Sequence, residues 1–120
     1  MQQRVLIVDD AMVDRERLQC IVAEAGCTVL LAASGAEALV QAKAARPDLI
    51  LMDVNMPDMD GFAATRKLKA DEATRDIPVV FVTGKNQKAD MAWGQMLGAR
   101  GYVTKPFTPE QILLQLGKAG

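Results

Sequence analysis

Five short apolar runs, separated by stretches with helical spacing, are the feature that most restricts the fold of this 120-residue chain. Four of the five are rich in valine, leucine and isoleucine, as expected for strands buried on both faces. Strict alternation of such strands with helices predicts a parallel sheet with right-handed crossovers and helices on both faces. The expected strands are residues 4–8, 28–32, 48–52, 79–82 and 101–104.

Helix signals fill the intervals between these strands. Gly26 supplies a stop after the first helical stretch. Ser34 with Glu37 matches a capping box, and Thr108 with Gln111 repeats this pattern before the last helix. The expected helices are residues 12–25, 35–46 and 89–97, with two further helices that begin at residues 61 and 109.

Polar side chains gather at one predicted edge of this sheet. Asp9 and Asp10 follow the first strand, and Asp53 follows the third. Thr83 ends the fourth strand and Lys105 follows the fifth. In open parallel sheets, ligands bind beyond the carboxyl ends of the strands. We therefore expect these five side chains to form the functional site.

Three carboxylates at one edge need a positive partner. Two like charges about 4 Å apart cost on the order of 4 kcal/mol at an effective dielectric of 20. Because the chain contains no histidine and its cysteines are not paired in a metal-binding motif, the expected cation is Mg²⁺ or Mn²⁺. Such a metal, together with the Thr83 hydroxyl and the Lys105 ammonium, suits the oxygens of a phosphoryl group. The residues therefore indicate an aspartate, Asp53, that accepts a phosphoryl group.

The joint spacing of these residues resembles the receiver domain of two-component response regulators. The resemblance covers essentially the whole chain and implies one receiver domain over residues 1–120. It also implies an α/β fold, the flavodoxin-like three-layer sandwich with a parallel five-stranded sheet in the order 2-1-3-4-5. The matching motifs are Asp9-Asp10, Asp53 with Met56-Pro57 and Gly61, Thr83-Gly84, and Lys105-Pro106-Phe107.

The resemblance assigns roles to the acidic residues. Asp53 would be the phospho-acceptor, and the phosphoryl donor would be a sensor histidine kinase. Asp10, Asp53 and the backbone carbonyl of Asn55 would hold Mg²⁺, with Asp9 in support. No enzymatic turnover is expected beyond autophosphorylation from small donors and autodephosphorylation.

The resemblance also implies a switch. Lys105 and Thr83 would contact the phosphoryl group, and the Lys105-Pro106 bond is often cis in this family. Tyr102 matches the aromatic residue that is thought to turn inward as the Thr83 hydroxyl moves. Gly84 departs from the pattern, since alanine is commoner there, and this substitution loosens the loop after the fourth strand.

A narrower resemblance concerns the fourth helix and the segment after it. The runs Ala92-Trp93-Gly94-Gln95 and Gly98 to Tyr102 resemble single-domain regulators of type IV pilus twitching motility, of the PilG and PilH type. Signalling would then proceed by protein contact through the fourth helix, fifth strand and fifth helix. Trp93 and Tyr102 are the expected partner surface.

Composition excludes several partners. The net charge of −1 comes without a basic cluster, which argues against nucleic acid. No apolar run approaches the roughly 20 residues of a membrane span, and no signal peptide precedes Val5, so we expect a cytoplasmic protein, either monomeric or weakly dimeric. Cys20 and Cys27 suggest neither a disulfide framework nor zinc and are expected to be small apolar fillers.

Three alternatives stay open at this point. The chain could be a receiver cut from a larger regulator with an output domain. It could be a haloacid-dehalogenase-type phosphatase, although the nucleophile of those enzymes normally follows the first strand. It could also be a flavodoxin, although Asp9 and Asp10 would repel a flavin phosphate.

Overall fold

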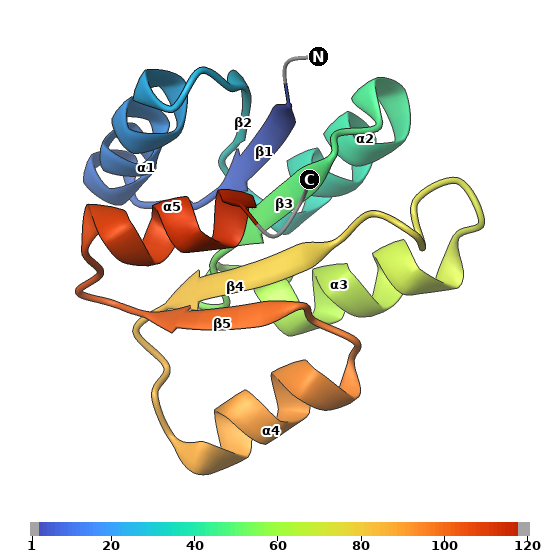
Figure 1. Cartoon of the computed structure of the whole chain (residues 1–120). Coiled ribbons are helices and arrows are strands. Elements are labelled where there is room, and N and C mark those ends of the chain that lie inside the picture. Colours follow the sequence, from blue (N-terminus) through green and yellow to red (C-terminus); the bar gives the residue numbers. More distant parts are fainter. Residues whose placement is uncertain (1–2, 118–120) are drawn as a thin grey trace.

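Five parallel strands form one sheet in the order β2-β1-β3-β4-β5 in the computed structural model, which describes residues 3–117 (Figure 1). This order and the parallel pairing confirm the predicted flavodoxin-like architecture. The strands are β1 (Arg4–Val8), β2 (Thr28–Ala32), β3 (Leu49–Met52), β4 (Val79–Thr83) and β5 (Gly101–Thr104).

Helices cover both faces of the sheet, which gives the three expected layers (Figure 1). One face carries α1 (Met12–Glu24) and α5 (Pro109–Gly117). The other face carries α2 (Gly35–Ala45), α3 (Gly61–Ala70) and α4 (Lys88–Met96). Every helix bound that the sequence predicts lies within one residue of the observed bound.

Two hydrophobic cores follow from the alternation of side chains along the strands. In β1, Leu6 and Val8 point toward α2 and α3, whereas Val5 and Ile7 point toward α1 and α5. All four of these side chains are fully buried. Because these strands are buried on both faces, they hold the residues at their carboxyl ends in place.

The predicted helix caps are present with one adjustment. The Ser34 hydroxyl accepts a hydrogen bond from the Glu37 amide, as predicted. The Glu37 carboxylate, however, accepts from the Ala33 amide rather than from Ser34. Thr108 and Gln111 cap each other reciprocally, through two side-chain to backbone hydrogen bonds.

The cysteine prediction was wrong for Cys20. Both cysteines carry free thiols, but Cys20 is exposed and only Cys27 is partly buried. Cys20 lies two residues from both Leu18 and Val22, the buried residues of α1, and is therefore on the opposite face of the helix. Within residues 3–117, no helix is long and apolar enough to cross a bilayer.

Candidate functional site

Backbone hydrogen bonds continue one residue beyond β1, β3 and β5, and they fix the residues that follow these strands. Because β1 lies between β2 and β3, the first residue after β1 and the first after β3 are neighbours at the same edge. The bonds run from Asp9 N to Ala32 O (3.1 Å), from Asp53 N to Val8 O (2.9 Å) and from Lys105 N to Thr83 O (2.8 Å).

Asp9 and Asp53 are both buried carboxylates that accept hydrogen bonds. Asp9 is fully buried, and its Oδ1 accepts from the Ala11 amide at 2.9 Å. Asp53 is 5% exposed, and its Oδ1 accepts from the Asn55 amide at 3.3 Å. The second oxygen of each carboxylate faces Lys105. The structure thus brings together residues that are 44 positions apart in the chain, as the sequence predicted.

Asp10 completes an acidic cluster with these two residues. One carboxylate oxygen from each of Asp9, Asp10 and Asp53 lies within 4.8 Å of the others, and Asp10 itself is exposed. Carboxylate oxygens around an open, partly exposed position suit Mg²⁺, which keeps several waters and takes few protein ligands. The donor set therefore fits the predicted metal.

The pKa of Asp9 is set mainly by the burial of its carboxyl group. Burial raises the pKa of Asp9 above its ordinary value, and the charge of Asp53 adds to this effect. Hydrogen bonds from Lys105 and from the Ala11 amide act in the opposite direction but do not cancel it. A cation bound beside Asp9 would act against this shift, because nearby positive charge favours the ionised carboxylate.

Lys105 is the cation at the centre of the site. Its Nζ lies 2.8 Å from Asp9 Oδ2 and 3.4 Å from Asp53 Oδ2. Burial alone would lower the pKa of Lys105, but hydrogen bonds to Asp14 and Asp9 and the charge of Asp53 outweigh burial and raise it. The ammonium is therefore charged throughout the neutral range. The Lys105-Pro106 bond is cis, as expected.

Asp14 is a third carboxylate on Lys105, and sequence reasoning missed it. Its Oδ2 lies 2.8 Å from Lys105 Nζ, as close as that of Asp9. Asp14 belongs to the first turn of α1. The only sequence signal was its position four residues after Asp10, which places it near the same edge of the sheet.

Thr83 and Tyr102 meet at the backbone of one loop residue, Lys85. The Thr83 hydroxyl is fully buried and accepts from the Lys85 amide at 3.3 Å. The Tyr102 hydroxyl donates to the Lys85 carbonyl at 2.7 Å. Burial, together with the charges of Asp90 and Asp53, raises the pKa of Tyr102 to about 12. The loop after β4 therefore links the two predicted switch residues.

Gly94 lets α4 approach this aromatic pair closely. A Cβ at Gly94 would lie 3.2 Å from ring atoms of both Phe81 and Tyr102. Trp93, its neighbour on α4, is 39% exposed, and the Arg66 guanidinium lies 5.9 Å from its ring centroid. Trp93 is thus accessible, as a partner-binding residue would have to be.

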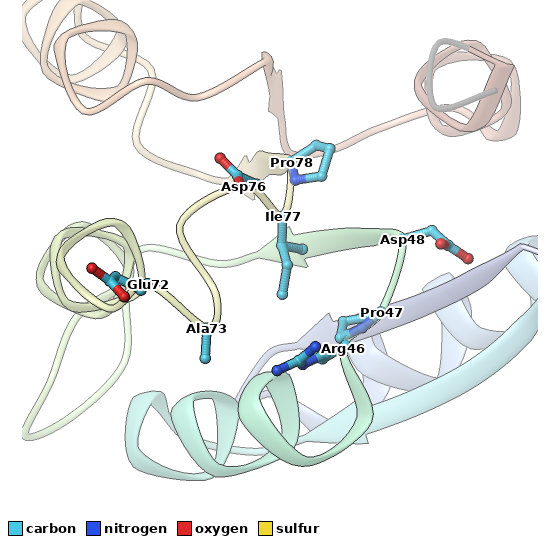
Figure 2. A pocket seen from close by; sticks show the side chains of 8 residues that line it. All are labelled: Arg46, Pro47, Asp48, Glu72, Ala73, Asp76, Ile77 and Pro78. Carbon is cyan, nitrogen blue, oxygen red and sulfur yellow. The ribbon is translucent and has the colours of Figure 1, made fainter.

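A cavity of about 390 Å³ lies at the opposite edge of the sheet (Figure 2). It is formed by the connections that lead into β3 and β4, at their amino ends. Since the acidic cluster lies at the carboxyl ends, this cavity is not part of the candidate site. It is lined by Arg46, Pro47, Asp48, Glu72, Ala73, Asp76, Ile77 and Pro78.

Comparison with known proteins points to the same family as the sequence motifs. The model of the response regulator receiver domain matches residues 5–116. Protein PilH of Pseudomonas aeruginosa strain PAO1 is 43% identical over 110 residues, which cover 92% of this chain and 91% of PilH. This similarity confirms the narrower resemblance drawn from the segment around Trp93.

Two solved structures extend the comparison to the fold and the metal. The chemotaxis protein CheY4 of Vibrio cholerae superposes with a TM-score of 0.93 at 34% identity, with both chains covered completely. The receiver domain of the sensor histidine kinase PA1611 from P. aeruginosa has a TM-score of 0.90 at 30% identity, covering 98% of this chain and 97% of that one. That structure has a magnesium ion coordinated in its active-site cleft.

Proposed function

The chain belongs to the response regulator receiver domain family, and from this premise we propose that it is a phosphorylation switch in which Asp53 accepts the phosphoryl group. Because the chain belongs to this family, we no longer consider the phosphatase and flavodoxin alternatives. We further propose that residues 1–120 form a single receiver domain, which the family match over residues 5–116 supports.

One observation carries the proposal: Lys105 Nζ bridges the carboxylates of Asp9 and Asp53 at the carboxyl edge of the sheet. A nucleophilic carboxylate must be held in place, and its burial must leave one oxygen directed to the donor. Asp53 meets the first need through its backbone bond to Val8. It meets the second through Oδ2, whose 3.4 Å contact is the longest that Lys105 makes with its three carboxylate partners. Catalysis of phosphoryl transfer depends mainly on such positioning and charge neutralisation.

The chemistry is a displacement at phosphorus. A carboxylate oxygen of Asp53 attacks the phosphorus of the phosphohistidine, and the bond from phosphorus to the imidazole nitrogen breaks with its electron pair left on nitrogen. Lys105 and Thr83 donate hydrogen bonds to the transferred oxygens. In dephosphorylation, water attacks phosphorus and the bond from phosphorus to the Asp53 oxygen breaks. The products are inorganic phosphate, a proton and the free carboxylate.

A divalent cation is the implied cofactor. When bound, Mg²⁺ supplies positive charge against the phosphoryl oxygens. We propose Asp10, Asp53 and the backbone carbonyl of Asn55 as its ligands, with Asp9 in support through its bonds to Ala11 and Lys105. Mn²⁺ has the same preference for oxygen ligands and is an expected substitute.

The switch path runs from Thr83 to Tyr102 through Lys85. If the Thr83 hydroxyl turns to the phosphoryl group, it withdraws from the Lys85 amide. The Lys85 carbonyl is the partner of Tyr102, so movement of this loop releases the tyrosine hydroxyl. Tyr102 can then change its packing against Phe81, whose ring centroid lies 5.9 Å away.

The output surface that we propose is the face formed by α4, β5 and α5. A cavity of about 240 Å³ on this face includes Met91, Arg100 and Tyr102 in its lining. Trp93 and Met96 on α4 are exposed apolar side chains. A change in Tyr102 would therefore alter a surface that already offers apolar contact area to a protein partner.

Beryllofluoride, a mimic of the phosphoryl group, tests the switch directly. With Mg²⁺ and beryllofluoride, we expect backbone NMR shifts at Thr83, Lys85, Tyr102 and α4 in the wild-type protein. The Asp53→Asn variant should show none of these shifts. Equal shifts in both proteins would contradict the proposal. A pull-down with and without beryllofluoride then identifies the downstream target.

We also predict the phosphoryl donor, the location in the cell and the oligomeric state. The phosphoryl donor is a sensor histidine kinase, because the family to which the chain belongs receives its phosphoryl group in this way. A cytoplasmic location, a monomeric or weakly dimeric state, and a lack of binding to nucleic acid or membrane follow from the composition discussed above.

A further inference from the structure

We propose that Asp14 is a positioning residue that competes with the phosphoryl group for Lys105 and thereby limits how firmly this protein holds its phosphoryl group. The inference rests on the proposed function of Asp53. It adds to that function a carboxylate of α1 that sets the strength of the Lys105 contact.

The donors of Lys105 are fully committed in the resting site. An ammonium has three N–H donors, and Lys105 has three carboxylate partners. Asp9 and Asp14 each lie 2.8 Å from Nζ, whereas Asp53 lies 3.4 Å away. A phosphoryl oxygen on Asp53 must draw the ammonium away from the two closer carboxylates. Asp14 therefore resists the contact that phosphorylation requires.

Asp9 and Asp14 differ in whether water can replace Lys105 as the partner of their carboxylates. The Asp9 side chain is fully buried and would be left as an unpaired buried charge if Lys105 moved away. The Asp14 side chain is 36% exposed, so water can replace Lys105 as its partner. Asp14 is thus the carboxylate whose pull on Lys105 can be removed without leaving a buried charge alone.

Two side chains of α1 fix its position, and one of them contacts the loop that carries Lys105. The Arg17 guanidinium lies 4.9 Å from the centroid of the Phe107 ring and also donates to the Phe107 carbonyl. Arg15 donates to the carbonyl of Asp9 at 2.7 Å. Because these contacts hold α1 in place, its first turn stays next to Lys105. The packing of α1 therefore sets the contact between Asp14 and Lys105, whose side chain is only 17% exposed.

The charge of Asp14 acts in the same direction as its hydrogen bond. Small phosphoryl donors are anions, and one more carboxylate at the acidic edge repels them. Partly exposed ion pairs contribute modestly, typically a fraction of 1 kcal/mol up to about 1 kcal/mol. Removal of the Asp14 charge should therefore change rates by about two- to five-fold.

A purely structural role predicts a different result. Asp14 lies in the first turn of α1, where a carboxylate interacts favourably with the helix dipole. Loss of that interaction would lower thermal stability slightly and would leave the chemistry at Asp53 unchanged.

The test compares the full chain with three variants at saturating Mg²⁺. Asp14→Asn removes the charge, and Asp14→Glu restores a carboxylate. Asp58→Asn is the matched control, because Asp58 is an exposed acid of the β3–α3 loop that forms no ion pair with Lys105. Asparagine also tolerates the positive φ of that position.

For Asp14→Asn we expect an apparent second-order rate constant of uptake from acetyl phosphate that is about two- to five-fold higher than in the wild type, and a longer lifetime of the phosphorylated form. Asp14→Glu should return both values toward wild type, and Asp58→Asn should leave them unchanged. The Lys105 Cε resonance of the donor-free protein should move in Asp14→Asn and stay in place in Asp58→Asn.

The positioning role would be overturned if Asp14→Asn had wild-type rates, or if Asp14→Asn and Asp58→Asn had equal effects. Asp53 would still be phosphorylated in that case, so the proposed function would stand. Failure of the wild-type protein to take up a phosphoryl group on Asp53 would instead overturn the proposed function. An unmoved Lys105 resonance in Asp14→Asn would contradict the contact itself.

Discussion

Gly61 lies directly against the backbone of Asp53, so closely that a Cβ at position 61 would overlap the Asp53 carbonyl oxygen. The Gly61 amide also donates to the carbonyl of Val54 at 2.9 Å. The first turn of α3 and the end of β3 are therefore packed backbone to backbone. The position of the proposed phospho-acceptor depends on the absence of a side chain eight residues later.

The Gly61→Ala substitution should therefore disturb both stability and the site. The overlap involves backbone atoms that cannot turn away, so we expect a loss of more than about 2 kcal/mol in the free energy of unfolding. Urea unfolding measures this loss. Uptake from acetyl phosphate should also fall, because the Asp53 backbone must move to accept the methyl group.

Gly84→Ala is the control for this substitution, since no atom lies within 4 Å of a Cβ at position 84. There we expect a change between zero and a gain of about 1 kcal/mol, because alanine restricts the unfolded chain. Similar losses at both glycines would show that the close approach of Gly61 to Asp53 does not matter.

Mg²⁺ should stabilise the folded protein. At a free concentration ten times the dissociation constant, binding to the native state alone adds about 1.4 kcal/mol. Asp10→Asn should raise the stability of the metal-free protein, because one of three mutually repelling carboxylates is neutralised, and should lose most of the Mg²⁺ increment. Thermal unfolding with Mg²⁺ and with a chelator measures both effects. An equal increment in Asp10→Asn would exclude Asp10 as a ligand.

Stability should fall in alkaline solution because of Tyr102. Its pKa is raised from 10.0 to about 12 in the folded state. Below pH 10 the tyrosine is protonated in both states, whereas between pH 10 and 12 only the unfolded chain loses the proton, so unfolding becomes easier as the pH rises. Tyr102 is the only tyrosine, so tyrosinate absorbance reports its ionisation directly.

The Tyr102→Phe variant isolates the contribution of the tyrosine hydroxyl. Its free energy of unfolding at neutral pH should fall by about 1 kcal/mol, the usual contribution of one hydrogen bond. Its dependence on pH between 10 and 12 should be weaker than that of the wild type. Parallel pH profiles would argue against a raised pKa for Tyr102.

Local patterns were sufficient to predict the strands, the helices and the convergence of Asp9, Asp53 and Lys105. Strand ends can be read from the sequence, and parallel pairing brings equivalent ends to one edge whatever the details of side-chain packing. The reciprocal cap of Thr108 and Gln111 is likewise local, because its partners are three residues apart.

Features that depend on how helices pack could not be predicted in this way. The contact between Asp14 and Lys105 spans 91 positions and depends on the rotation of α1 about its axis. The close approach at Gly94 requires the distance between α4 and the rings of Phe81 and Tyr102. None of these quantities appears in the spacing of apolar residues.

The central claim is that Asp53 accepts the phosphoryl group, and intact-protein mass spectrometry after incubation with acetyl phosphate and Mg²⁺ tests it most directly. The account predicts the addition of one phosphoryl group to the wild-type protein, with peptide mapping that locates it on Asp53. Asp53→Ala should gain none, and Asp58→Asn should gain as much as the wild type. Full labelling of Asp53→Ala at another residue would contradict the account.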